Sequence, residues 1–156
     1  MAVITEYIRE LLDDPGTLKL LATISPDGTP HAAYKGTLRA EGDELVYYDL
    51  LQSSETNKNM VHAIWFDKKV SITILSKERE VYQIVGRPDR CITAGGEFEK
   101  TYRYLREQLG DTDLNAIWYI HPEKIRDNSL KARKQFQEEN FPILTRLDTI
   151  IKQEKT

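Results

Sequence analysis

Two apolar segments separated by a short polar turn constrain the fold of this chain more than any other feature. The segments are residues 18–24 and 31–38, and Pro26-Asp27-Gly28-Thr29 lies between them. Proline presets the φ angle that a turn needs and glycine accepts a positive φ, so this stretch predicts an antiparallel β-hairpin. The rest of the chain is expected to build on this hairpin.

Four later segments also have the composition of β-strands. They are residues 45–48, 70–75, 81–92 and 114–121. Residues 39–44 are polar and are expected to form a loop between the second and third strands. Gly86 and Pro88, inside the segment 81–92, mark a bulge or bend, which is a device that curls a sheet into a barrel. Six short strands joined by short turns therefore predict a closed or nearly closed antiparallel barrel.

Helices are predicted at the periphery of this barrel. Apolar residues at helical spacing mark residues 4–13, 57–66, 97–109 and 130–154. The first helix would be capped by Thr5. The second is expected to turn Met60, Ile64 and Trp65 toward the core.

Charge and cysteine content exclude several classes of function. Lys and Arg number 22 against 25 Asp and Glu, so the net charge is −3 and no broad attraction to nucleic acid is expected. No apolar stretch approaches the roughly 20 residues that span a bilayer, and the first residues lack the pattern of a signal peptide. We therefore expect a cytoplasmic protein with one domain over residues 1–156, a core at about 17–128, and no membrane partner.

Few side chains point directly to chemistry. His31, His62 and His121 share no metal-ligand spacing, so no metal site is expected. Cys91 has no second cysteine to pair with and is expected to pack as a small apolar residue. The sequence identifies no catalytic residue.

The order of the segments is similar to that of a known family. The stretches LATISPDGTPHAAYKG, LVYYD, SSETNKNM, VSITIL and VYQIVGRPDR follow one another between residues 18 and 128. In this order the chain resembles the FMN-binding split β-barrel of the pyridoxamine 5′-phosphate oxidase-like flavoproteins. The resemblance implies a mainly β fold with peripheral helices, built as a six-stranded antiparallel split barrel of the FMN-binding type.

The resemblance also implies a homodimer that holds one FMN in each of two clefts between the subunits. A shallow cleft on a single barrel would bury too little of the ligand, so a second wall is needed. The apolar faces of the N-terminal and C-terminal helices, together with Trp118-Tyr119, are expected to supply the interface.

Two segments carry the cofactor site that the resemblance implies. In the family, the second strand runs beside the flavin and its closing basic residue approaches the phosphate; here that strand carries His31, Ala32, Ala33, Tyr34 and Lys35. The other segment supplies Tyr48, Asp49, Ser53, Ser54, Thr56 and Lys58. The alternatives are an ordinary strand with an exposed lysine and a capped helix start with solvated polar residues.

The phosphate site departs from the family pattern. The oxidase has an Arg-Lys pair where this sequence has Ser54-Glu55, and Glu55 would repel a phosphate. The phosphate would then depend on hydroxyl groups, on amides at the helix start, and on Lys35 and Lys58. Residues 126–156 also lack a match to the oxidase's substrate-phosphate segment, so oxidation of pyridoxamine phosphate itself is not expected.

Three functions remain open at this point. The leading one is an FMN-dependent oxidoreductase that acts on an unidentified small redox substrate. The second is a non-enzymatic FMN-binding or electron-transfer protein, and the third is a split barrel that binds haem, another ligand or nothing. In both flavin cases the protein would bind FMN and tune its ring, whereas the redox chemistry belongs to the cofactor.

Overall fold

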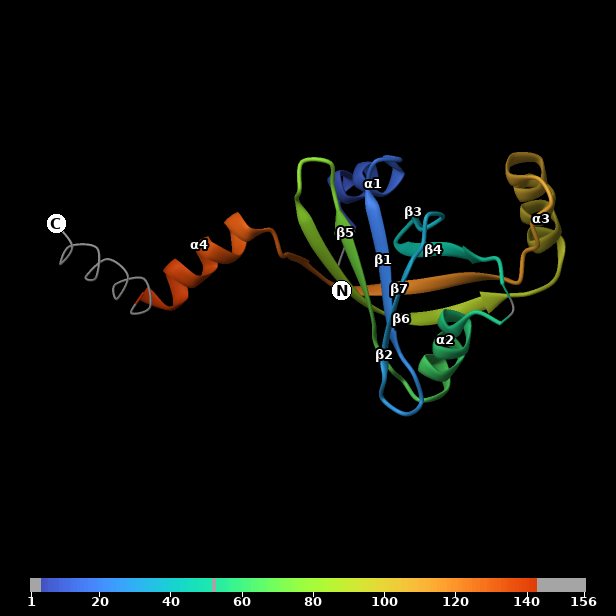
Figure 1. Cartoon of the computed structure of the whole chain (residues 1–156), viewed down its shortest axis with the longest axis horizontal. Coiled ribbons are helices and arrows are strands. Elements are labelled where there is room, and N and C mark those ends of the chain that lie inside the picture. Colours follow the sequence, from blue (N-terminus) through green and yellow to red (C-terminus); the bar gives the residue numbers. More distant parts are fainter. Residues whose placement is uncertain (1–3, 52, 143–156) are drawn as a thin grey trace.

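A curled antiparallel sheet of seven strands forms the centre of the molecule (Figure 1). The computed structural model describes residues 4–51 and 53–142. The strands are β1 (Leu18–Ile24), β2 (Pro30–Tyr34), β3 (Arg39–Glu41), β4 (Glu44–Asp49), β5 (Val70–Leu75), β6 (Val81–Ile92) and β7 (Ala116–Asp127). The helices are α1 (Glu6–Asp13), α2 (Glu55–Trp65), α3 (Gly96–Leu109) and α4 (Leu130–Asn140). The strand order is β2-β1-β5-β6-β7-β4-β3, and all neighbouring pairs are antiparallel.

The sheet has one strand more than the six that the sequence predicted. The additional strand is β3, which pairs with β4 from Arg39↔Val46 onward, inside the stretch predicted as a polar loop. Gly42, at a φ of 58°, makes the tight turn between these two strands. Only Ala40 of β3 packs against the core, whereas Arg39 and Glu41 point away from it and form an ion pair. Because two of its three residues are charged, β3 lacks the apolar and β-branched residues by which a strand is recognised in a sequence.

The predicted hairpin is confirmed, because β1 and β2 pair in continuous antiparallel register. Gly28 occupies the turn at a φ of 85°, a conformation that favours glycine. Strand β2 ends at Tyr34 rather than at residue 38, because the N–H of Leu38 bonds to the carbonyl of Lys35 at 3.1 Å and turns the chain toward β3.

The predicted bend in the long strand is also confirmed. Strand β6 pairs with both β5 and β7, and its register against β7 shifts beside Gly86 and again after Pro88. At Gly86 a Cβ atom would lie 2.5 Å from the carbonyl oxygen of His121, closer than real Cβ contacts allow. Glycine is therefore required there by the close approach of β7.

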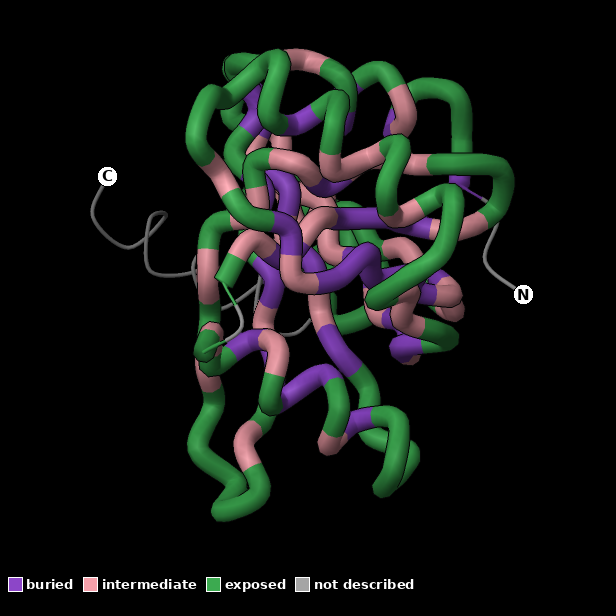
Figure 2. Tube along the Cα trace, turned by 90° about the vertical axis from the view of Figure 1, so that its right-hand side faces the viewer, coloured by how far each residue is buried: buried purple, intermediate pink, exposed green. Residues whose placement is uncertain are grey.

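Side chains are buried on both faces of the sheet. The larger core cluster includes Leu21, Tyr47, Ile72 and Trp118, each at most 1% exposed. The second cluster contains Val46 of β4 and further residues from β7 and α3. Buried positions gather in the strands, whereas the hairpin turns are exposed (Figure 2).

Helix α1 forms where the sequence predicts it, but its apolar residues Ile8, Leu11 and Leu12 are buried in the core of their own chain, so the expectation that they supply the interface was wrong. Thr5 caps α1, since its hydroxyl accepts a hydrogen bond from the N–H of Ile8 at 3.3 Å.

Helix α2 follows the prediction in part. Met60 of α2 is buried, but Ile64 and Trp65 are 41% and 78% exposed, so their predicted inward orientation was wrong. The inward face of α2 is centred near Thr56 and Met60, and at about 100° per residue Trp65 lies on the opposite side.

Trp118 and Tyr119 are core residues of their own chain. They are 1% and 5% exposed, and Trp118 Nε1 donates a hydrogen bond to the amide oxygen of Asn57 at 3.0 Å. The expectation that they supply exposed interface surface was therefore wrong. Their strand, β7, lies between β6 and β4, where both faces are covered.

Helix α4 extends away from the sheet and buries none of its residues (Figure 1). The remainder of the predicted C-terminal helix, with its apolar stripe at Ile143, Leu147 and Ile150-Ile151, lies outside the described residues. Among the helices that the structure describes, none combines the length and the apolar composition that a membrane crossing requires.

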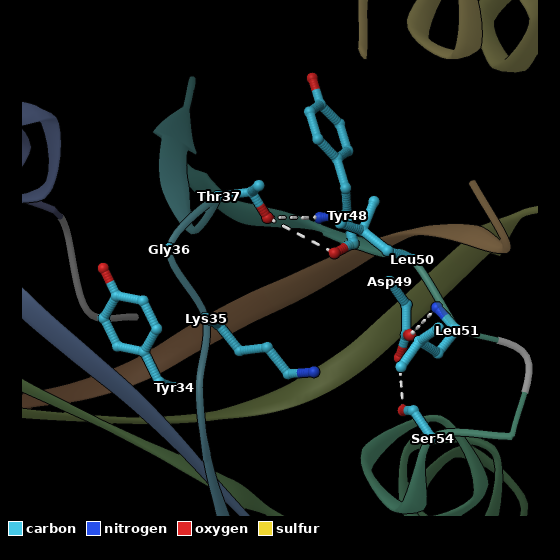
Figure 3. A pocket seen from close by; sticks show the side chains of 9 residues that line it. All are labelled: Tyr34, Lys35, Gly36, Thr37, Tyr48, Asp49, Leu50, Leu51 and Ser54. Carbon is cyan, nitrogen blue, oxygen red and sulfur yellow. Dashed lines mark hydrogen bonds between the residues drawn. The ribbon is translucent and has the colours of Figure 1, made fainter. Parts of the chain in front are cut away.

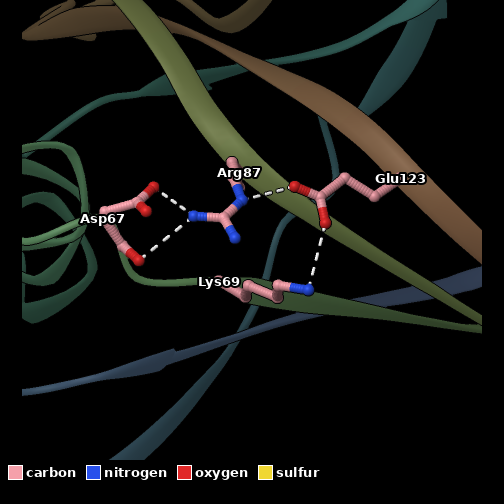
Figure 4. A network of polar contacts seen from close by, with 4 residues as sticks. All are labelled: Asp67, Lys69, Arg87 and Glu123. Atoms are coloured by element: carbon pink, nitrogen blue, oxygen red, sulfur yellow. Dashed lines mark hydrogen bonds and ion pairs between the residues drawn. The ribbon is translucent and has the colours of Figure 1, made fainter. Parts of the chain in front are cut away.

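Charged side chains tie the turn after α2 to the bent region of the sheet (Figure 4). Arg87 of β6 donates hydrogen bonds to Asp67 and to Glu123 of β7, and Lys69 Nζ lies 3.2 Å from Glu123. Hydrogen bonds from Lys69 and Arg87 lower the pKa of Glu123. Because the side chain of Asp67 is exposed, we expect this cluster to fix the turn rather than to add much stability.

We predict that Gly86→Ala destabilises the protein, because the added methyl group would collide with the β7 backbone. The expected loss is about 1–3 kcal/mol in the free energy of unfolding, the usual range for overpacking. Denaturant titration of both proteins measures it. Gly96→Ala is the matched control, since a Cβ at Gly96 meets no atom within 4 Å, and it should not lower the stability.

Candidate functional site

A cavity of about 310 Å³ lies between the end of β2, the end of β4 and the start of α2 (Figure 3). Three short segments of the chain form its walls. The lining residues are Tyr34, Lys35, Gly36, Thr37, Tyr48, Asp49, Leu50, Leu51 and Ser54. This volume is at the lower end of the range for small-molecule sites, about 300–1,000 Å³.

The buried carboxylate of Asp49 organises the wall next to α2. One oxygen accepts a hydrogen bond from the N–H of Leu51 at 3.2 Å, and the other accepts one from the hydroxyl of Ser54 at 2.9 Å. The same Ser54 hydroxyl accepts a hydrogen bond from the N–H of Asn57 at 2.9 Å and so caps α2. Asp49 is only 2% exposed, and its two hydrogen bonds hold the loop at Leu51 and the start of α2 together.

Lys35 supplies the positive charge of the cavity. Its side chain extends from the β2 side toward Asp49 and Leu51 (Figure 3). Its ammonium group lies 5.3 Å from the ring centroid of Tyr47, but none of the described carboxylates lies within ion-pair distance of it. Because a lysine without a carboxylate partner keeps its charge available, Lys35 is placed to meet an anionic group of a ligand.

Two polar side chains, Thr37 and Lys19, hold the segment between β2 and β3. The hydroxyl of Thr37 accepts a hydrogen bond from the N–H of Tyr48 at 3.0 Å. This backbone group would otherwise need a partner from a neighbouring strand. Lys19 is 7% exposed, and its ammonium group donates to the carbonyls of Leu12, Gly36 and Leu38 at 2.8–3.0 Å. Burial lowers the pKa of Lys19. This buried cation joins α1 to the cavity wall.

The structure brings together five of the eleven predicted site residues. They are Tyr34, Lys35, Tyr48, Asp49 and Ser54. The other six do not line this cavity: Ala32 is exposed, Ala33 is half-buried, Ser53 and Lys58 are exposed, Thr56 is buried, and His31 lies at a neighbouring cavity.

Sequence reasoning missed Thr37, Leu50 and Leu51 as lining residues. Residues 31–38 were expected to form one continuous strand, in which Thr37 would have been an ordinary strand residue and not part of a cavity wall. Its hydroxyl directly after Lys35-Gly36 was the available signal, since glycine often ends a strand and threonine can cap the neighbouring backbone.

His31 lines a second cavity of about 400 Å³ at the turn of the β1–β2 hairpin. Glu55 forms the opposite wall of that cavity. The predicted conflict between Glu55 and a bound phosphate is thereby reduced, because Ser54 and Glu55 face different cavities. Within the described residues, no three His, Cys, Asp or Glu side chains gather as a metal site would require.

Residues 4–133 match the protein family described as pyridoxamine 5′-phosphate oxidase. The chain belongs to this family. All seven strands and both cavities lie within the matched residues, so the family resemblance seen in the sequence is confirmed. No curated protein matches the chain.

Solved structures share the fold of this member of the pyridoxamine 5′-phosphate oxidase family. HupZ of Group A Streptococcus is 23% identical, with 82% of this chain and 96% of HupZ covered and a TM-score of 0.67. An FMN-binding protein from Syntrophomonas wolfei subsp. wolfei is 17% identical, with 78% and 84% covered and a TM-score of 0.62. HutZ, the heme storage protein from Vibrio cholerae, is 15% identical, with 81% and 95% covered and a TM-score of 0.55. The family fold therefore occurs with different ligands.

We predict that Lys19→Met destabilises this family member and loosens the cavity wall. Three backbone carbonyls would lose their donor, at roughly 1–3 kcal/mol each, while the cost of burying a charge would be removed. The expected net loss is on the order of 2 kcal/mol in the free energy of unfolding. Amide hydrogen exchange of residues 35–38 is the more specific measurement, and unchanged protection there would contradict the role given to Lys19.

Proposed function

We propose that this protein binds FMN in the cavity between β2, β4 and α2. The observation that carries the proposal is the ammonium group of Lys35, which faces the capped start of α2 across the cavity and has no carboxylate partner among the described residues. Family membership and the fold shared with an FMN-binding protein support the choice of ligand. The helix start adds N–H groups that favour a phosphate.

The cavity offers FMN a cation, two hydroxyls and small side chains. Lys35 would meet the phosphate or the pyrimidine edge of the ring. The hydroxyl oxygens of Thr37 and Ser54 would accept hydrogen bonds from the ligand, because their protons go to the carbonyl of Tyr48 and to Asp49. His31 and Ala33 share a face of β2 with Lys35, because side chains alternate along a strand. That face would run beside the flavin. Ala32, Ser53, Thr56 and Lys58 were predicted contacts, and titration of their variants tests them.

An oxidoreductase that acts on a small substrate is the activity that we propose. Bound FMN would supply the electron-transfer chemistry, and the protein would orient the ring and exclude water from one side. A non-enzymatic role in FMN binding or electron transfer is the alternative. Reduction of the bound flavin by NAD(P)H, followed by repeated turnover with an acceptor, distinguishes an enzyme from a carrier.

Haem is the second candidate ligand. The fold shared with HutZ supports it, and the half-buried imidazole of His31 at the second cavity is a possible iron ligand. The absorption spectrum of the purified protein tests both candidates, because flavin and haem absorb in distinct bands. A haem band without a flavin band would overturn the FMN proposal.

We also propose a homodimer that forms through the outer face of β1. Leu18, Leu20 and Ile24 are 52%, 42% and 45% exposed on that face, and Tyr34 of β2 lies beside Leu20. Described residues leave this apolar face uncovered, and such patches favour association. A twofold interface would bury it in both copies at once. The projecting helix α4 would contact the partner, since it buries nothing in its own chain.

We predict that Lys35→Ala weakens FMN binding by roughly 1–3 kcal/mol, the range for a charge-assisted hydrogen bond. Titration of the apoprotein with FMN and with riboflavin measures it, and the loss should be confined to FMN if Lys35 meets the phosphate. Lys68→Ala is the control, because Lys68 is an exposed lysine in the turn after α2. An equal loss in both variants, or none in Lys35→Ala, would remove Lys35 from the site.

We predict that Leu20→Glu converts the dimer to a monomer, because it places two charges in the proposed apolar interface. Sedimentation equilibrium at low micromolar concentration measures the change. Trp65→Glu is the control, since Trp65 is a large exposed apolar residue at the end of α2 and is not part of the β1 face. A wild-type monomer that still binds FMN would show that the single chain completes the site.

A further inference from the structure

A third cavity, of about 280 Å³, lies between α3 and the outer side of β3 and β4. Helix α3 leaves room there because Leu105 is its only buried residue. The lining residues are Thr37, Arg39, Tyr48, Tyr104, Leu105, Gln108 and Leu109. Tyr48 and Thr37 also line the cavity proposed for FMN, so these two residues separate the two sites.

Aromatic and aliphatic side chains form most of this third cavity. Tyr104 and Leu109 are each 55% exposed and lie outside the second core cluster, so the fold of the chain does not use their apolar surface. Tyr48 forms the opposite wall, and burial raises its pKa. The neutral phenol ring of Tyr48 gives this wall a flat, uncharged surface against which a flat apolar group can pack.

Arg39 gives the cavity one positive charge at a fixed position. Its guanidinium carbon lies 4.4 Å from the ring centroid of Tyr48, and its side chain is 28% exposed. Nη2 donates to Glu41, but Nε and Nη1 donate to no described residue. A guanidinium stacked on an aromatic ring holds its remaining donors in a fixed plane, where the carboxylate of a ligand can accept from them.

We propose that this cavity binds a small planar aromatic acid, with its ring between Tyr104 and Tyr48 and its carboxylate on Arg39. Two fused rings fit a cavity of this size, and a carboxylate would satisfy the free donors of the guanidinium. The site does not depend on the proposed function, because Arg39 and Tyr104 do not line the cavity proposed for FMN. A second copy of the chain is the competing occupant.

The experiment compares 2-naphthoate with its neutral isostere 2-naphthamide by calorimetric titration of the full chain. Arg39→Gln should weaken naphthoate binding by about tenfold or more, because a charge-assisted hydrogen bond is lost, and should leave naphthamide binding unchanged. Tyr104→Ala should weaken both probes. Glu41→Gln should strengthen naphthoate binding severalfold, because it removes the competing carboxylate from Nη2.

Two controls locate the site. Arg103→Gln removes an exposed arginine from the same helix but not from this cavity, and it should change neither affinity. Lys35→Ala should also leave naphthoate binding unchanged, which separates this site from the cavity proposed for FMN. A loss in either control equal to that in Arg39→Gln would overturn the proposal. Absence of naphthoate binding, with Leu109→Arg altering the sedimentation of the chain, would instead identify an interface between copies.

Discussion

The bend of β6 at Gly86 determines where all the candidate site residues lie. In the sheet order, β2 and β4 are five strand positions apart, which would be roughly 24 Å in a flat sheet with strands about 4.8 Å apart. Lys35 and Asp49 nevertheless line one cavity. The sheet must curl for this to happen, and the short connection of residues 35–38 between β2 and β3 draws its two edges together. Close contact of β6 with β7 at Gly86 permits that curl.

The cavity combines opposite charges that are held in different ways. Asp49 is buried and already accepts hydrogen bonds from Leu51 and Ser54, so part of its charge is compensated before any ligand arrives. Among the described residues Lys35 has no such partner, and the ammonium group of Lys19 donates to backbone carbonyls, two of which belong to the same segment. The net field that a ligand meets is therefore set by Lys35. This arrangement favours an anionic group at the mouth of the cavity.

The two cavities proposed as binding sites meet at one aromatic side chain. The backbone of Tyr48 lines the cavity proposed for FMN, and its ring stacks with the guanidinium of Arg39. Thr37 bonds to both backbone groups of Tyr48, at 3.0 and 3.4 Å, and so holds this wall in place. A ligand on either side would contact a wall that the other side shares, and a coupling between two sites acts equally in both directions.

Local patterns in the sequence determined the elements, and long-range packing decided their roles. The turn Pro26 to Thr29 specified the hairpin, and the alternation in residues 70–75 specified a strand with the bounds that the structure has. Period-two alternation does not say which face is inside: β1 buries Lys19 and exposes Leu18 and Leu20, against the usual preference. Only the tertiary structure decided this, because Lys19 finds three carbonyls that come from α1 and the segment before β3. The family resemblance placed Lys35 and Asp49 in one cofactor site, but the residue pattern alone could not, because only the curl of the sheet brings the ends of β2 and β4 to one cavity.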